Sequence, residues 1–473
     1  MAQPHMSPEE FRAHGHEVID WIADYWTHIA EYPVLSRVVP GEIRDQLPTA
    51  APAEPESFDN ILADLDSVIM PGITHWQHPA FFAYFPANSS PAAVLADLLS
   101  SGIGAQGMIW STSPAATELE QVVLDWLSTA LGLPVAFKNT GSGGGVIQDT
   151  ASTSTMTAIL AALHRASAGS IRESGVRADQ YALYASTQAH SSVLKAAMMT
   201  GLGANAVREI CVDPATQAMN PQALREALLT DREAGVLPVL VVSAVGTTST
   251  CAIDPTAQIG ALCREFGAWL HVDAAFAGVA AICPEFRYIN DGVAEFADSY
   301  VTNPHKWMLT TFDCSTFWVR DRSALVDALS ILPEYLRNHA SESGQVVDYR
   351  DWHPQLGRRF RSLKLWTVLR TYGISGVAQH IRSGVAMAAQ FEEFVRSDPR
   401  FELLTPRSLS VVVFGLVDSD RTMELMERVN QSGKAYLTHT KVEGKPAMRM
   451  AIGGVWTEPE HVRATWELLQ QLV

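Results

Sequence analysis

Residues 303–307, NPHKW, and residues 271–275, HVDAA, carry the strongest evidence in this sequence about its fold. Each follows a short run that predicts a buried strand, at 299–301 before Lys306 and at 268–270 before Asp273. Taken alone, either residue is more often a solvated or capping group than a functional one. Together they indicate a site, because the carboxyl ends of parallel strands lie at one edge of a sheet, where ligands bind.

The region between about residues 140 and 320 alternates between strand-like and helix-like segments. Strands are expected at 181–186, 207–212, 238–245 and 268–272, and helices at 191–200, 221–235 and 256–266. Strands separated by helices of about ten to fifteen residues predict βαβ units and a mainly parallel sheet. Four polar residues follow predicted strands and are expected at its ligand-binding edge, namely His190, Thr248, Asp273 and Lys306.

Helical segments flank this alternating region. Ser7, Pro8 and Glu10 have the pattern of a capping box, and apolar residues then recur at helical spacing as far as Ile29. Either a second subunit or the chain's own large domain could cover this apolar face, and periodicity does not choose between them. After about residue 364, a long helical stretch precedes expected strands at 408–414 and 447–452 and a closing helix at 458–472, which indicates a smaller α+β lobe.

The composition excludes several classes of protein. The 473 residues exceed one ordinary domain, and 47% hydrophobic with 18% charged residues is typical of a globular protein. A formal net charge of -17 argues against nucleic-acid or anionic-membrane partners, because clustered cations bind phosphates. The five cysteines show no CxxC spacing, so we expect reduced thiols, a cytoplasmic location and no metal site. The first residues lack the pattern of a secretory signal.

A lysine and an aspartate at the same edge of a sheet are the pair that pyridoxal phosphate requires. The amine condenses with the cofactor aldehyde, and the carboxylate keeps the pyridine nitrogen protonated so that the ring can withdraw electrons. The hydroxyl-rich turn at 150–155, before a helix expected near Met156, predicts a cradle for the phosphate. The glycine run 141–145 is equally consistent with a phosphate loop and a hairpin tip. His190 could stack on the pyridine ring, whereas His271 is interpreted as structural.

Five segments match one enzyme family in order and with compatible spacing. They are 78–86 (HPAFFAYFP), the segment around His190, 271–275, 303–307 and 356–364 (LGRRFRSLK). The chain thereby resembles the group II pyridoxal-phosphate decarboxylases, specifically the aromatic-L-amino-acid decarboxylases, from its first helix to its last.

This resemblance implies an α/β protein of pyridoxal-phosphate fold type I, similar to aspartate aminotransferase, with a mainly parallel seven-stranded sheet in its large domain. It also implies a homodimer with shared active sites. The expected parts are an N-terminal helical dimerisation segment (1–90), a large cofactor-binding domain (91–363) and a small C-terminal α+β domain (364–473).

The resemblance also implies roles for individual residues. Lys306 would attach the cofactor, Asp273 would contact its pyridine nitrogen, and His190 and Ala275 would lie against its two faces. Thr248 would lie near the ring and the substrate carboxylate. The residues that would hold the phosphate are Thr150, Ala151, Ser152, Asn303 and His305.

The expected outcome of the reaction depends on one tyrosine. Residues 332–339 match the family's mobile lid, whose tyrosine serves the protonation step, and Tyr335 occupies that position. Related enzymes that form aldehydes by oxidative deamination carry phenylalanine there, so Tyr335 favours simple decarboxylation to an arylalkylamine. An aromatic aldehyde synthase is the alternative on the same fold. A nucleotide-binding regulatory module that uses the glycine run is a third hypothesis from another class.

The expected substrates are aromatic L-amino acids, of the tryptophan, 5-hydroxytryptophan, phenylalanine, tyrosine and dihydroxyphenylalanine class. Gly357 lies where small residues accompany indole-accepting members of the family, which favours tryptophan-type substrates. Arg358 falls at the family's position for supporting the cofactor and the lid. The family's substrate pocket corresponds to Trp76, Tyr84, Phe85, Pro86, Thr248, Gly357 and Arg358, completed across the dimer by Gln106 and Met108.

Overall fold

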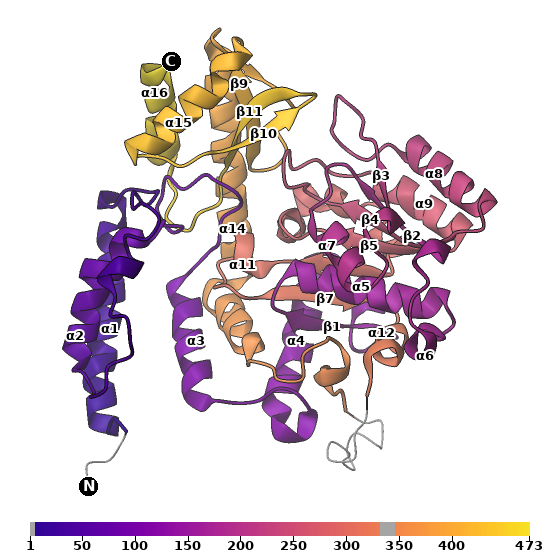
Figure 1. The fold of residues 1–473 in the computed structure, drawn as a ribbon, viewed down its shortest axis with the longest axis horizontal. Helices are drawn as coiled ribbons and strands as arrows, with labels where there is room; N and C mark the ends of the chain where they lie inside the picture. Colours follow the sequence, from indigo (N-terminus) through magenta and orange to yellow (C-terminus); the bar gives the residue numbers. More distant parts are fainter. Residues whose placement is uncertain (1–4, 332–345) are drawn as a thin grey trace.

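The computed structural model describes residues 5–331 and 346–473 of the chain. Figure 1 shows the N-terminal helices on one side, a large α/β part on the other and a smaller part that contains the C-terminus. The large part is built on a seven-stranded sheet and the smaller one on a four-stranded sheet. The domain boundaries after residues 90 and 363 stay a prediction.

The large sheet has the strand order β1-β7-β6-β5-β4-β2-β3. Neighbouring strands run parallel except at β7, which is antiparallel to both β1 and β6. The expected mainly parallel seven-stranded sheet is therefore confirmed. Its strands are β1 (Gly144–Gln148), β2 (Tyr181–Ser186), β3 (Val207–Ile210), β4 (Leu237–Ala244), β5 (Trp269–Asp273), β6 (Ser299–Thr302) and β7 (Ser315–Val319).

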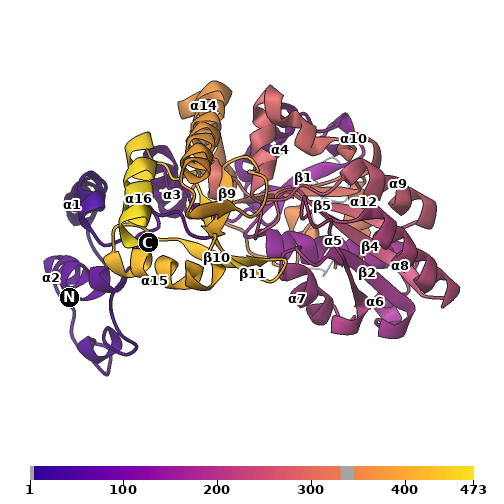
Figure 2. The same cartoon turned by 90° about the horizontal axis from the view of Figure 1, so that it is seen from above.

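Alternate side chains of these strands enter two cores, one on each face of the sheet. Val146 packs in the core that includes residues of α5 and α7, whereas its neighbour Ile147 packs in the core that includes residues of α4 and α9. Figure 2 shows these two pairs of helices on opposite sides of the strands. The four helices are α4 (Pro114–Ala130), α5 (Ala151–Ala166), α7 (Ser192–Met199) and α9 (Thr256–Phe266), and α8 (Pro221–Glu233) also contributes to the core that contains Ile147.

The glycine run 141–145 leads into β1 and is explained by packing. A Cβ atom on Gly145 would lie 2.7 Å from the Trp318 side chain of β7, and one on Gly143 would lie 2.0 Å from the Val319 carbonyl. Neither strand of this pair was expected from the sequence. Glycines have low strand propensity, so the local signal for β1 is weak.

The smaller part contains an antiparallel sheet in the order β10-β11-β9-β8. The long helix α14 (Arg361–Ser397) connects it to the large part and is broken at Gly373, whose φ of 62° and ψ of 170° are not helical. The predicted strands near 408–414 and 447–452 and the closing helix are present, whereas β8 and β10 were not expected. The elements are β8 (Phe401–Leu403), β9 (Val411–Leu416), α15 (Thr422–Ser432), β10 (Thr438–Val442), β11 (Lys445–Ala451) and α16 (Pro459–Leu472).

The N-terminal helix α1 (Pro8–His28) begins with the expected capping box at Ser7. Both views place α1 at the far end of the molecule from the seven-stranded sheet (Figures 1 and 2). None of its residues is buried, and its contacts are with nearby N-terminal residues such as Asp66 and with Trp456 of the smaller part. Its own large domain therefore does not cover its apolar face. Within the described residues, no helix is long and apolar enough to cross a membrane.

Candidate active site

Asp273 and Lys306 reach one cavity from neighbouring strands. Asp273 is the last residue of β5, and Lys306 lies in the single-turn helix α11 (Pro304–Trp307) that follows β6. β5 and β6 are parallel neighbours, so both strand ends lie at the same edge of the sheet. Both residues line a cavity of about 220 Å3. The two groups are thus placed to contact one small molecule, as the sequence predicted.

A column of aromatic rings holds the lysine turn in place. The Trp307 ring is fully buried and stacks on Phe276 with 5.0 Å between ring centroids, and Phe276 stacks on Phe85 at 3.9 Å. The Lys306 Nζ atom lies 5.2 Å from the centroid of the Phe85 ring. Rigid stacking of this kind positions the amine without a flexible loop.

The electrostatics of the cavity favour a neutral amine on Lys306. Burial lowers the pKa of Lys306; the charge of Asp273 opposes this shift and that of Arg449 adds to it. Burial also lowers the pKa of His190, with Asp273 again opposing and Lys306 adding. His190 Nδ1 accepts a hydrogen bond of 3.1 Å from the Ser192 N–H, so a neutral ring carries its proton on Nε2.

The N-terminus of α5 forms one wall of the same cavity. The helix begins at Ala151, five residues before the expected start near Met156, which corrects that prediction. Serine and threonine are weak helix formers, so the sequence alone indicated a longer turn. Thr150 is the N-cap residue, and it lines the cavity together with Ala151 and Ser152. The first N–H groups of a helix lack intrahelical partners and favour an anion, as the predicted phosphate cradle requires.

Two further cavity residues have hydrogen-bonding capacity to offer a ligand. Asn303 Oδ1 is buried and has no hydrogen-bond partner in residues 5–331 and 346–473, and an amide can also turn to present its NH2 group. His305 Nδ1 accepts a bond of 2.9 Å from the Cys314 N–H, and burial lowers the pKa of His305 to about 3. A neutral His305 therefore carries its proton on Nε2. The donors, the carboxylate and the amine together fit pyridoxal phosphate.

A second, larger cavity of about 760 Å3 adjoins the first and shares Lys306, His190 and Thr248 with it. Several residues predicted for the aromatic side-chain pocket line this cavity, and the rings of two of them, Trp76 and Tyr84, stack at 5.6 Å. The predicted residues that line this cavity are Trp76, Tyr84, Phe85, Pro86 and Thr248, and those that line the smaller one include Thr150, Ala151, Ser152, Ala275, Asn303 and His305.

Four predicted substrate residues do not line either cavity within one chain. Arg358 is buried in an ion pair with Glu120 at 2.5 Å, and its backbone N–H donates to Gln106 Oε1 at 3.0 Å. Gly357 lies beside Gln106, and the Met108 carbonyl accepts from the Arg350 N–H at 2.9 Å. These residues form a neighbouring cluster, and their action across a dimer stays a prediction. Tyr335 lies outside the described residues.

The smaller part supplies residues that the sequence analysis missed. Arg449 of β11 lies 4.8 Å above the Phe85 ring, donates to the Ser249 and Tyr84 carbonyls and lines the larger cavity. Its Nη2 atom is buried without a hydrogen-bond partner among the described residues, and burial lowers the pKa of Arg449 to about 10. A signal was present, because an arginine inside the apolar run 447–452 requires a buried partner or a ligand. Tyr436, Thr438 and His439 also line this cavity.

Tyr84 has a backbone φ of 50°, a left-handed conformation that costs a non-glycine residue about 1–2 kcal/mol. Its N–H donates to Thr438 Oγ1 at 3.2 Å, and its carbonyl accepts from Arg449. The smaller part thus holds this strained residue, whose ring forms a wall of the larger cavity.

Known proteins share both the sequence and the fold. The chain matches the model of the pyridoxal-dependent decarboxylase conserved domain over residues 40–417. It is 46% identical to phenylacetaldehyde synthase of Arabidopsis thaliana over 98% of this chain and 96% of that protein, and 45% identical to tryptophan decarboxylase 2 of Oryza sativa subsp. japonica over 98% and 95%. The crystal structure of Oryza sativa TDC with PLP and tryptamine superposes with a TM-score of 0.97 at 42% identity, covering 100% of this chain and 99% of that one.

Proposed function

The chain belongs to the family of pyridoxal-dependent decarboxylases, and we propose that it converts aromatic L-amino acids to arylalkylamines and carbon dioxide. Its cofactor is pyridoxal phosphate. The observation that carries the proposal is a cavity lined by Lys306, Asp273 and the N-terminus of α5. This cavity adjoins a larger one that has aromatic walls. The similarity to tryptophan decarboxylase 2 supports the substrate class.

Each residue of the smaller cavity has a proposed task toward the cofactor. When bound, pyridoxal phosphate supplies the electron sink for the carbon–carbon bond that breaks. Lys306 would supply the neutral amine that attaches the cofactor, and Asp273 would hold a proton on its pyridine nitrogen. His190 and Ala275 would lie against the two faces of the ring. The phosphate would be held by Thr150, Ala151, Ser152, Asn303 and His305.

The larger cavity would hold the amino acid. The stacked Trp76 and Tyr84 rings offer a flat apolar surface for an aromatic side chain, while Thr248 and Arg449 offer polar groups near Lys306. Because no residue in the described part of the chain accepts a hydrogen bond from Arg449 Nη2, this atom can donate to the substrate carboxylate. Gln106, Met108, Gly357 and Arg358 would complete the pocket of a second subunit, and Tyr335 would donate the proton that replaces the carboxylate.

Replacing Arg449 with methionine is expected to lower kcat/KM about ten- to a hundredfold, mainly through KM, because one charge-assisted hydrogen bond is lost. Steady-state amine release, with cofactor absorbance as a check on loading, measures the effect. Arg428, an exposed arginine on α15, provides the matched control as Arg428→Met. Equal KM values in both variants would show that Arg449 does not contact the substrate.

The product decides between two outcomes on this site. The similarity to phenylacetaldehyde synthase favours aldehyde formation as a second candidate, with ammonia and peroxide as co-products. Incubating the holoenzyme with each of the five expected amino acids and measuring amine, aldehyde and peroxide separates the candidates. Amine in excess supports the proposal, whereas peroxide in proportion to substrate consumed supports the alternative.

We also propose a homodimer, supported by apolar surface that the single chain leaves uncovered. In α1 the Phe11 side chain is 60% exposed, and α3 (Pro91–Ile103) exposes Leu95, Leu99 and Ile103. Figure 1 shows α3 on the same side of the seven-stranded sheet as α1. Changing Leu99 to glutamate is expected to shift the mass in solution, as measured by light scattering, from dimer toward monomer. It is also expected to lower the rate of amine release. The exposed Val417 serves as the control in Val417→Glu, and a monomeric wild type would contradict the proposal.

A cytoplasmic location is also proposed. All five cysteines are free thiols, and four of them are buried, which suits a reducing compartment.

A further inference from the structure

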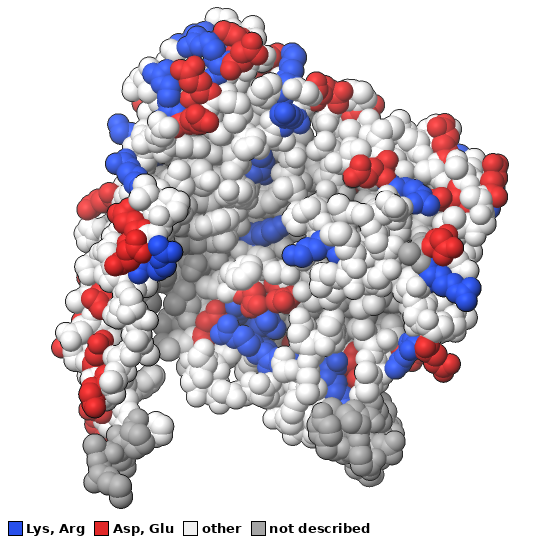
Figure 3. Space-filling model, viewed as in Figure 1, with Lys and Arg blue, Asp and Glu red and all other residues white. Residues whose placement is uncertain are grey.

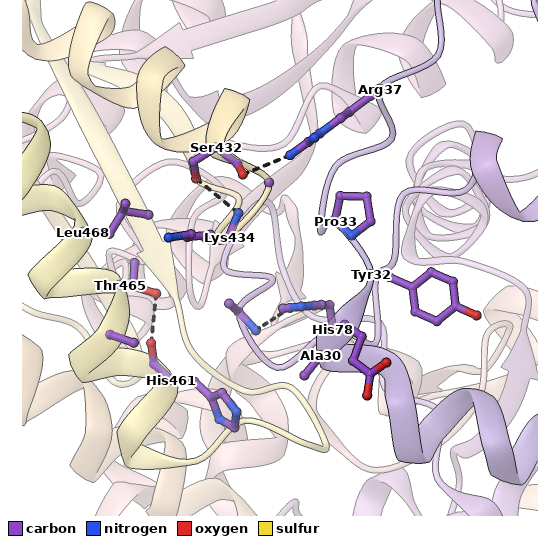
Figure 4. Close-up of a pocket in the computed structure, with 14 residues that line it drawn as sticks. Ala30, Tyr32, Pro33, Arg37, His78, Ser432, Lys434, His461, Thr465 and Leu468 are labelled. Carbon is purple, nitrogen blue, oxygen red and sulfur yellow. Dashed lines mark hydrogen bonds between the residues drawn. The ribbon is translucent and has the colours of Figure 1, made fainter.

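A third cavity, of about 480 Å3, lies between the N-terminal segment and the smaller part (Figure 4). It shares no lining residue with the two active-site cavities. Its walls come from residues 30–37, from His78 and Ala80, from the end of α15 at 432–434 and from one face of α16. Segments far apart in the sequence therefore enclose it.

His78 presents a buried donor to this cavity. Its side chain is 6% exposed, and Nδ1 accepts a hydrogen bond of 2.9 Å from the Ala80 N–H, which leaves the proton of a neutral ring on Nε2. Nε2 is buried without a well-formed hydrogen bond, although the Ala30 carbonyl beside it favours a proton there. Burial lowers the pKa of His78 to about 4, so at neutral pH the ring is an uncharged donor.

His461 has the same arrangement on the opposite wall. Its Nδ1 accepts a bond of 3.0 Å from the Glu458 N–H at the start of α16, so its Nε2 also carries the proton. His461 thus offers the cavity an N–H group and no ring acceptor, whereas the Nε2 proton of His78 lies beside the Ala30 carbonyl. A donor that lines a cavity favours a ligand that brings an acceptor.

Two permanent cations complete the polar lining. Arg37 donates to the Ser432 carbonyl at 3.0 Å, as drawn in Figure 4, and Lys434 lies beside it. Neither side chain is in an ion pair within the described residues, and the single acidic residue of the lining is Glu31. Gly433, with a φ of 74°, permits the close approach of Arg37, since a Cβ there would lie 2.4 Å from its Nη2. On a chain with a net charge of -17, whose acidic and basic side chains are interspersed on the face that Figure 3 shows, this is a local excess of positive charge.

The rest of the lining is apolar. Pro33, Ala80, Ala464 and Leu468 contribute hydrocarbon, and the Tyr32 ring lies at the edge of the cavity. An apolar wall next to a cluster of donors fits a ligand with one anionic end and a hydrophobic body. Glu31 disfavours a doubly charged anion, because like charges repel at short distance.

We propose that this cavity binds a small organic monocarboxylate with an apolar body, held by Lys434, Arg37 and the His461 N–H group. The bound molecule would contact the N-terminal segment and the smaller part at once. Ligands that bind only the folded chain raise its unfolding temperature, so occupancy would stabilise the holoenzyme. This site is separate from the proposed catalytic function and does not depend on it.

Hexanoate is a suitable probe, because it has the required charge and body and no amine with which to react as a substrate. Titration calorimetry on the holoenzyme is expected to give one saturable site per chain and a higher Tm. Lys434→Gln is expected to weaken binding at least about tenfold by removing a charged donor. Ala464→Trp, on the exposed side of α16, is expected to abolish binding by filling the cavity. Both variants should retain wild-type kcat, and Lys441→Gln, an exposed lysine of β10, should bind normally.

Several results would overturn the proposal. The first is the absence of saturable hexanoate binding, and the second is binding that is unchanged in both variants. The third is binding that shifts the cofactor absorbance and is competed by an aromatic amino acid, because that result would place hexanoate in the active site. Hexanol and inorganic phosphate provide the remaining arms. Equal binding of hexanol would rule out a need for charge, and equal binding of phosphate would rule out a need for an apolar body.

Discussion

Lys306→Ala is expected to lower turnover of aromatic amino acids at least about a thousandfold and to remove the visible absorbance of the attached cofactor. The reason is that this amine is proposed to attach the cofactor. The stacked rings of Trp307, Phe276 and Phe85 hold it beyond the carboxyl end of β6, where burial lowers its pKa. Residues that act as nucleophiles or acid–base groups commonly contribute factors of this size. The measurements are amine release under saturating cofactor and the absorbance spectrum.

Lys195→Ala provides the control for this substitution. Lys195 is an exposed lysine of α7, the helix that follows His190, so its removal tests the loss of a nearby charge without loss of the cavity amine. Borohydride reduction of the wild type followed by peptide mapping should place the cofactor on Lys306. Wild-type turnover in Lys306→Ala, or labelling of another lysine, would refute the assignment of the site.

Asp273→Asn is expected to lower kcat about a hundred- to a thousandfold while leaving the cofactor attached. Asparagine preserves the shape and the bond that Asp273 Oδ1 accepts from the Ala275 N–H at 3.1 Å, but it carries no negative charge. A neutral amide cannot hold a proton on the pyridine nitrogen, and preorganised charges in a closed site contribute factors of this order. Because Asp273 raises the pKa of Lys306, its loss leaves the lysine amine more readily neutral and still able to bind the cofactor.

The measurements are kcat and the cofactor spectrum of Asp273→Asn, compared with those of Asp291→Asn. Asp291 is an exposed aspartate between Asp273 and Lys306 in the sequence. A loss of kcat with retained absorbance separates the charge of Asp273 from its packing. A variant that loses the cofactor altogether would indicate that the carboxylate mainly holds the fold of the strand end. Unchanged kcat would contradict its contact with the ring nitrogen.

Much of the fold was predictable because local patterns and tertiary packing agree. The runs before Asp273 and Lys306 form β5 and β6, and the helices expected at 191–200, 221–235 and 256–266 correspond to α7, α8 and α9. In a sheet covered on both faces, parallel strands become continuous apolar runs, which are easy to detect. The ordered motifs then led from the fold to the cofactor and to the family.

Other elements were missed where local propensity opposed the final structure. The start of α5 at Ala151 is rich in serine and threonine, and β1 begins with glycines, so neither has a strong local signal. In β10 the burial alternates, and the strand is defined by pairing with β11. Such segments adopt their structure because neighbours far along the chain stabilise it.

Local patterns were sufficient to place Asp273 and Lys306 at the carboxyl ends of strands, because strand patterns and the parallel connection rule specify the edge of the sheet that they share. The position of Arg449 required the folded chain, since this residue reaches the same space from the smaller part, above Phe85, with Nη2 buried and unpaired among the described residues. Likewise, only the folded chain brings His78, Lys434 and His461 around one cavity. Burial and unpaired donors depend on contacts between segments hundreds of residues apart, and no local pattern contains that information.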